Sequence, residues 1–269
     1  MAVRFELPDG HPHVAVVTID HVERANSLDP PTLRGLADAW RRIAAEPGIR
    51  CAVLTGAGDR VFCSGMDMRT TIPAAQAFAR GERVPDDVFA ALRDVGTATL
   101  AGFDVGVPIV CAVNGHARAG GFDLMLATDL RYTTPEATFA LEEVALGLYP
   151  TGNATVLLPR QIPWVHAQDL LLTARPIDAE RAREIGLVNA IVLYEDLLPT
   201  ALDAADAIAR NAPLAVRATR AGVRELLHLP LADAYRRQEE LGRPLRRTAD
   251  AREAQRAFVE RRRPVWTGK

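Results

Sequence analysis

Two acidic positions lie beside glycine-rich or turn-like stretches, where their carboxyl groups could take part in acid–base chemistry. Asp123 closely follows the pair Gly120-Gly121, and Glu143 lies in a later acidic pair with Glu142. One such carboxyl group could take a proton from water while the other supplies one to carbon. Gly120 opens a predicted helix, where unpaired N–H groups favour negative charge. The alternative for both acids is a purely structural role at a helix start, stabilised by the helix dipole.

Three familiar motifs for other chemistries are incomplete. Residues 56–58 (GAG) follow a predicted strand, but Val61 replaces the third glycine of a dinucleotide-binding turn. Residues 115–121 have glycines at a spacing close to that of a phosphate loop, yet Gly121 and Phe122 stand where lysine and a hydroxyl residue are needed. Ser64 lacks the glycine that precedes the nucleophile of a hydrolase elbow. These motifs therefore indicate no dinucleotide site, phosphate loop or serine nucleophile.

Five segments together carry a resemblance to a known family. They are residues 24–28 (RANSL), 62–67 (FCSGMD), 114–123 (NGHARAGGFD), 139–150 (FALEEVALGLYP) and 262–268 (RRPVWTG). In order and approximate spacing they resemble the signature blocks of the crotonase family, the enoyl-CoA hydratases and isomerases. The resemblance runs from about residue 14 to the end of the chain. It implies a crotonase-like α/β fold with a ββα-type spiral core, and an enzyme that stabilises an enolate made from an acyl-CoA thioester.

The resemblance implies an oxyanion hole formed by the backbone N–H groups of Met66 and Gly120. Two fixed backbone donors can stabilise a developing oxyanion without reorganising. It also implies coenzyme A contacts near Ser27, Ser64, Met66 and Met68, made largely through the backbone. Coenzyme A enters as part of the substrate, and no metal or redox cofactor is implied.

The resemblance places the two catalytic carboxyl groups at Asp123 and Glu143. Glu143 is preferred over Glu142 because Gly147 and Pro150 follow it at the family's intervals. Hydration of a trans-2-enoyl-CoA would use Asp123 to position or deprotonate water and Glu143 to protonate the α-carbon. An isomerase using Glu143 alone, another acyl-CoA enzyme of the family, and a non-catalytic acyl-CoA binding protein are the alternatives.

Several positions depart from the family pattern. Asp123 replaces a glutamate and reaches roughly 1.5 Å less, about one carbon–carbon bond. Met66 replaces a small residue, and Ala119 replaces the first glycine of a triplet. Residues 151–154 (TGNA) replace a glycine-rich turn. Because misplacement on this scale can cost about a hundredfold in rate, water addition is less firmly indicated than enolate stabilisation.

Composition sets broad limits on the other possible functions. The 269 residues are 48% hydrophobic and 25% charged, with a formal net charge of -2. This balance is typical of a globular protein and disfavours binding to nucleic acid or to an anionic membrane surface. No signal-like or membrane-spanning apolar run is present, so a cytoplasmic location is expected. Three cysteines without metal-like spacing are expected to be buried free thiols.

The order of predicted elements supports an α/β fold. Short β-branched runs predict strands at residues 14–19, 51–55 and 108–113, with a helix at 32–45 between the first two. A helix at 122–127 and strands at 130–133 and 137–141 follow.

The C-terminal part of the sequence is helical in its periodicity. Helices are expected at 179–185, 197–210, 214–227, 231–241 and 250–262. We therefore divide the chain into a core at 1–195 and a helical C-terminal region at 196–269. Residues 70–92 are expected to form a mobile flap. The resemblance implies a homotrimer or homohexamer, with the C-terminal region at the interface.

Overall fold

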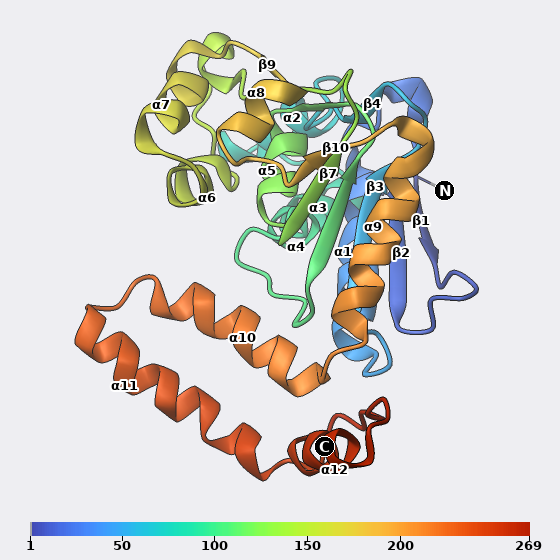
Figure 1. Ribbon diagram of the computed structural model, residues 1–269. Helices are drawn as coiled ribbons and strands as arrows, with labels where there is room; N and C mark the ends of the chain where they lie inside the picture. The colour runs from blue at the N-terminus through green and yellow to red at the C-terminus, as the bar shows by residue number, and fades with distance from the viewer. Residues whose placement is uncertain (1) are drawn as a thin grey trace.

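A six-stranded sheet forms the centre of the computed structural model, which describes residues 2–269 (Figure 1). Its strands, in spatial order, are β1 (Val3–Glu6), β2 (Val14–Ile19), β3 (Cys51–Gly56), β5 (Ile109–Val113), β7 (Leu130–Thr133) and β10 (Ala190–Ile191). Only β1 is antiparallel to its neighbour. The strands predicted at 14–19, 51–55, 108–113 and 130–133 are confirmed to within a residue at their ends.

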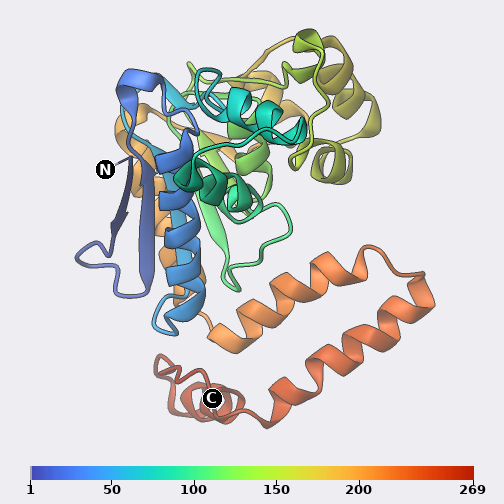
Figure 2. The same cartoon turned by 180° about the vertical axis from the view of Figure 1, so that it is seen from behind.

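Two helices cover the two faces of this sheet. Helix α1 (Pro30–Ala45) begins after Asp29, whose side chain accepts a hydrogen bond at its N-terminus. Helix α9 (Tyr194–Ala209) lies against the opposite face (Figures 1 and 2). Because successive side chains of a strand point to opposite faces, Val16 packs with the α9 cluster whereas Val17 packs with the α1 cluster. The sheet is thus buried on both sides, as its nearly continuous apolar strands require.

A second, smaller sheet makes the spiral. Its strands, in spatial order, are β4 (Val61–Cys63), β6 (His116–Arg118), β8 (Thr138–Ala140) and β9 (Ile177–Asp178). Each of the pairs β3–β4, β5–β6 and β7–β8 contributes one strand to each sheet, and β6 is followed at once by helix α5 (Gly120–Leu126). This repeated ββ unit confirms the crotonase-like fold.

Residues 70–92, expected to form a mobile flap, are largely helical. They form α2 (Thr71–Ala79) and α3 (Asp86–Arg93), separated by a short turn. The rings of Phe78 and Phe89 lie 5.3 Å apart, so that the two helices pack on each other. Proline and glycine interrupt the segment only between and near the ends of its helices. Whether the segment moves as a flap stays a prediction. The remaining short helices are η1 (Val22–Arg24), α4 (Val95–Ala98), η2 (Glu143–Leu146), α6 (Ala154–Gln161), α7 (Trp164–Thr173) and α8 (Ala179–Glu184).

The C-terminal helices project away from the core as an arm (Figures 1 and 2). The arm contains α10 (Pro213–Leu226), α11 (Leu231–Gly242), η3 (Pro244–Arg247) and α12 (Ala249–Glu260). It departs after α9, which itself packs on the central sheet although the boundary expected at residue 195 assigns most of α9 to the C-terminal region. The division of the chain into domains stays a prediction.

Charged contacts attach the arm to the core. Arg220 on α10 donates to Asp104 at 2.5 Å and to Asp129 at 2.8 Å, and Arg224 reaches the other oxygen of Asp129 at 3.1 Å. Burial of the Arg220 side chain is nearly complete. These pairs fix the angle at which α10 leaves the core.

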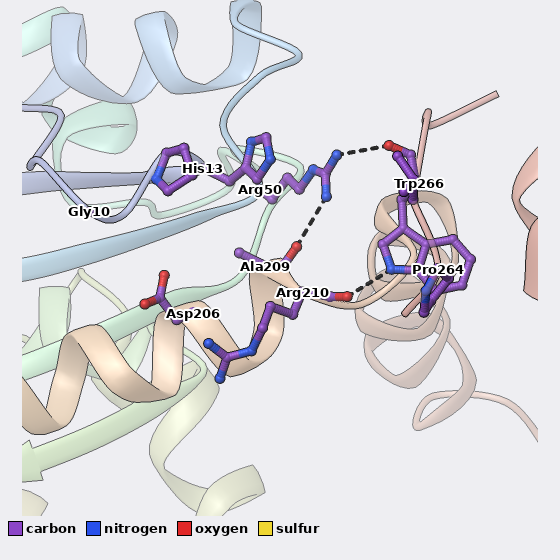
Figure 3. Close-up of a pocket in the computed structure, with 10 residues that line it drawn as sticks. Gly10, His13, Arg50, Asp206, Ala209, Arg210, Pro264 and Trp266 are labelled. Carbon is purple, nitrogen blue, oxygen red and sulfur yellow. Dashed lines mark hydrogen bonds between the residues drawn. The ribbon is translucent and has the colours of Figure 1, made fainter. Parts of the chain in front are cut away.

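The end of the chain returns to the core beside α9 (Figure 3). Arg50 donates to the carbonyl oxygens of Ala209 and Trp266, and the Trp266 indole N–H donates to the carbonyl of Arg210 at 2.7 Å. A pocket of about 430 Å³ lies here, and none of the predicted site residues lines it. Among the helices of residues 2–269, none combines the length and apolar character needed to cross a bilayer.

Candidate active site

The backbone N–H groups of Met66 and Gly120 lie beside each other. A β-carbon placed on Gly120 would be 3.5 Å from the Met66 nitrogen, and one on Gly65 would be 3.0 Å from the Gly120 nitrogen. Met66 forms a parallel bridge with Leu28 in which Leu28 N–H donates to the carbonyl of Gly65 and Asp67 N–H donates to the carbonyl of Leu28. Since successive N–H groups of an extended chain point in opposite directions, the Met66 N–H points away from Leu28.

The Gly120 N–H is the first of helix α5, where no intrahelical acceptor exists. Within residues 2–269, neither this N–H nor that of Met66 donates to a protein acceptor. Gly121 permits the close approach that brings the two donors together, because a β-carbon there would lie only 2.2 Å from the carbonyl oxygen of Cys63. The structure therefore brings together the two donors expected from the sequence.

Ala119, the helix N-cap, adopts a backbone conformation that side chains rarely tolerate. Its φ is 43° and its ψ is -121°, a region that glycine occupies easily and alanine does not. Such strain typically costs about 1–3 kcal/mol. Alanine at residue 119 is thus accommodated in a conformation suited to glycine, at the expense of backbone strain.

Asp67 anchors the turn that carries Met66. Its Oδ1 accepts hydrogen bonds from the backbone of Arg69 and from the backbone and hydroxyl of Thr70, while Oδ2 accepts from Ser27 and Arg24. Although burial opposes charge on Asp67, these donors together lower its pKa to about 2. The aspartate is therefore a fixed anion whose role is to hold the turn.

Asp123 is almost fully buried on α5, 4% exposed. Its Oδ1 accepts the N–H of Ala154 at 2.5 Å, at the start of α6, and its backbone oxygen accepts from the Asn153 side chain. Oδ2 lies directly against Gly152, where a β-carbon would come within 2.2 Å of it. Burial and the nearby Glu143 raise the pKa of Asp123 to about 7, and the donors on Asn153 and Ala154 partly oppose this.

Glu143 begins η2, and its carboxyl is the second acid of the site. Burial is the main cause that raises its pKa, and the charge of the adjacent Glu142 adds to it. Its Oε2 is buried without a hydrogen-bond partner among the described residues. Glu142, in contrast, is half exposed and paired with Arg118. The carboxyl groups of Asp123 and Glu143 thus lie close enough to repel each other. Of the adjacent pair, Glu142 is held in an ion pair, whereas Glu143 has a carboxyl oxygen without a partner among the described residues.

The residues expected to contact coenzyme A surround the same turn. Ser27 is buried and its hydroxyl donates to Asp67, so a ligand could reach only its backbone. Ser64 donates its backbone N–H to Ala25, whereas the Met68 side chain is 57% exposed. Their contacts to coenzyme A stay a prediction.

The residues that support the site were not predicted from the sequence. Asn26 lies after β2 and Asn114 directly after β5, and both are buried. Both donate to the carbonyl of Val61 at the start of β4, and each also donates to the turn between β3 and β4. Their position in signature blocks was the available signal. The contact of Gly152 with Asp123 had no local signal, because the two residues lie on separate elements.

Comparison with known proteins places the chain in a family. The family model described as Enoyl-CoA hydratase/isomerase matches residues 9–269. The chain is 38% identical over 254 residues to enoyl-CoA hydratase EchA19 of Mycobacterium tuberculosis, covering 94% of this chain and 92% of the relative. It is 39% identical over 256 residues to (E)-benzylidenesuccinyl-CoA hydratase of Thauera aromatica, covering 95% and 96%.

Solved structures of enoyl-CoA hydratases resemble this chain over its whole length. A crystal structure of enoyl-CoA hydratase from Bacillus anthracis superposes with a TM-score of 0.89 at 29% identity, covering all of both chains. One of enoyl-CoA hydratase from Mycobacterium tuberculosis gives 0.85 at 34% identity, covering 100% of this chain and 99% of that one. Both the sequence match and the superposition extend through the site and the C-terminal arm. The chain therefore belongs to the enoyl-CoA hydratase/isomerase family.

Proposed function

We propose that the protein is an enoyl-CoA hydratase, adding water across the double bond of a trans-2-enoyl-CoA. The observation that carries the proposal is the combination of two free backbone donors, on Met66 and Gly120, with two buried carboxyl groups of raised pKa, on Asp123 and Glu143. Relatives named as hydratases support the same assignment.

In the proposed reaction the backbone donors and the two acids have separate roles. The two N–H groups hold the thioester oxygen, where negative charge develops as water adds to the β-carbon. Asp123 and Glu143 repel each other, so near neutral pH the pair retains a proton that two isolated carboxyl groups would have lost. In the proposed reaction Asp123 takes the proton from water and Glu143 delivers one to the α-carbon. Each turnover leaves the proton on Asp123 rather than Glu143, and exchange with solvent restores the starting state.

The short side chain of Asp123 is compatible with this role because the turn at residues 152–154 lies close against its carboxyl. Gly152 and the N–H of Ala154 lie directly against the carboxyl. They hold the carboxyl in one orientation. A carboxyl held in one orientation is what a water-activating base requires.

The test is turnover of a panel of enoyl-CoAs of different chain length, followed by loss of the conjugated thioester's ultraviolet absorbance and by mass spectrometry. We expect addition of one water, and we expect Asp123→Asn and Glu143→Gln to slow it to the residual rate that the two oxyanion donors alone support. Retained double-bond migration in Asp123→Asn would instead favour an isomerase that uses Glu143 alone. Binding of acyl-CoA without any turnover would favour a non-catalytic binding protein.

We also propose that the protein assembles as a homotrimer or as a homohexamer of two trimers. The arm exposes large apolar side chains that a monomer would leave in water: Val223, Leu227, Leu231, Tyr235, Phe258 and Val259. Exposed apolar groups gathered on one region mark interaction surfaces. Sedimentation as a monomer at micromolar concentration would contradict this.

A further inference from the structure

One polar cluster lies next to the proposed site and has no role in the chemistry described so far. It contains His116 and Arg118 on β6, Thr138 on β8 and Glu142 just beyond β8. Strands β6 and β8 are parallel neighbours, with Ala117 opposite Phe139, and the side chains of these two face the buried core. By the alternation of side chains along a strand, His116, Arg118 and Thr138 share the other face.

The cluster is tied together by hydrogen bonds across the two strands. The Thr138 hydroxyl lies 2.9 Å from Nδ1 of His116 and accepts a hydrogen bond from Nη2 of Arg118 at 2.8 Å. The other terminal nitrogen of the guanidinium, Nη1, donates to Oε1 of Glu142 at 3.4 Å. Arg118 therefore spans from its own strand to the chain beyond the next one.

Both ends of this contact are close to proposed catalytic groups along the chain. Arg118 precedes Gly120, whose N–H is one of the two oxyanion donors, by two residues. Glu142 directly precedes Glu143. The backbones are also joined at this point, because Ala119 N–H donates to the carbonyl of Ala140 at 3.0 Å. The ion pair thus connects the strand end that carries an oxyanion donor with the 3₁₀ turn that carries an acid.

We infer that Arg118 is a positioning residue, whose ion pair with Glu142 sets the distance between the Gly120 N–H and the Glu143 carboxyl and neutralises the charge beside that carboxyl. This inference rests on the proposed function, in which both groups act on one thioester. Arg118 acts through Glu142 and the strand ends, not as an acid, a base or an oxyanion donor.

Electrostatics gives the inference a signature that packing alone would not produce. The charge of Glu142 raises the pKa of Glu143, and Arg118 lies against Glu142 and offsets that charge. The other acid facing Glu143 is Asp123 on α5. Helix α7 also packs on η2; its His166 and Asp169 are paired with Arg181 and Arg175.

The experiment compares Arg118→Met, Arg118→Lys and Glu142→Gln with the wild-type protein. Removing Arg118 leaves Glu142 unneutralised, so the pKa of Glu143 should rise by roughly half a pH unit, the scale expected for one more unscreened charge several ångströms away in a partly exposed site. Removing the charge of Glu142 should lower it. Loosening the turn should also reduce kcat by about tenfold in Arg118→Met, with little change in KM and recovery in Arg118→Lys.

Two measurements report these changes independently. The pH profile of kcat gives the apparent pKa values of the bound enzyme, and a carbon-13 titration of Glu143, assigned with Glu143→Gln, gives its pKa without turnover. Arg183→Met is the matched control, because Arg183 forms a surface ion pair with Glu180 on α8, in an element that supplies none of the proposed catalytic groups. It should change neither measurement.

Opposite pKa shifts in Arg118→Met and Glu142→Gln, with recovery in Arg118→Lys, are the expected result. Unchanged pKa values, shifts in the same direction, or an equal loss in the control would overturn the inference. If Arg118→Met does not fold, Glu142→Gln decides, since Glu142 is half exposed. A wild-type protein that hydrates no enoyl-CoA would refute the proposed function. The carbon-13 titration would still measure the effect of Arg118 on the pKa of Glu143.

Discussion

Gly152 offers a direct test of whether Asp123 takes part in the chemistry. A β-carbon at this position would lie 2.2 Å from Oδ2 and 2.4 Å from Cγ of Asp123. The backbone of Gly152 is not in the left-handed region, so alanine can adopt its conformation without strain. The effect of Gly152→Ala must therefore come from the collision with the carboxyl.

The size of the effect follows from the overlap. Ordinary van der Waals contact begins near 3.4 Å, so the Asp123 carboxyl or the turn that carries residue 152 must move by more than 1 Å. A displacement of about 1 Å in a catalytic group can cost about a hundredfold in rate. Overpacking also costs about 1–3 kcal/mol of stability. We expect kcat to fall by about a hundredfold while KM, set mainly by contacts to coenzyme A, changes little.

The assay is steady-state hydration of the best enoyl-CoA of the panel, at a temperature well below the thermal midpoint of the variant. Gly48→Ala is the matched control, because Gly48 also lies outside the left-handed region and has open space around its β-carbon. The double variant with Asp123→Asn should be no slower than Asp123→Asn alone, since residues that act through one group are not additive. Wild-type kcat in folded Gly152→Ala, or independent losses in the double variant, would refute the proposed role of Asp123.

Three further outcomes are expected. Ala119→Gly should raise the free energy of unfolding by about 1 kcal/mol, because glycine relieves the strained φ of 43°; a loss of stability in urea would contradict this. Asp67→Ala should lower the free energy of unfolding by about 3 kcal/mol and speed amide hydrogen exchange at Met66, since a buried anion with five hydrogen bonds is removed. Unchanged exchange at Met66 would count against the anchoring role of Asp67. Raised from 3.8 to about 7 in the folded protein, the pKa of Asp123 implies stability that is complete at low pH and falls by up to about 4 kcal/mol as pH rises through this range. Asp123→Asn should flatten that fall in denaturation experiments at several pH values.

The central sheet and the main helices could be predicted from local patterns. Residues 14–19 and 51–55 are nearly unbroken apolar runs because their strands are covered on both faces, and the segment between them carries a helix cap at Asp29. The small sheet could not be predicted in full, because β4 and β6 are only three residues long and too short to show a period. The two helices within residues 70–92 were not predicted, since alanine-rich polar sequence with a few breakers does not distinguish short helices from a loop.

The sequence by itself determined that two small-residue turns and two acids occur in the order of the enoyl-CoA hydratase/isomerase family, since this information lies in residue type and spacing. Tertiary structure alone decided what surrounds the acids. Asp123 meets Gly152 and Ala154 from a different element, and Arg118 meets Glu142 across two strands. Burial and neighbouring charge set proton affinity, and both depend on parts of the chain far from the acid in sequence.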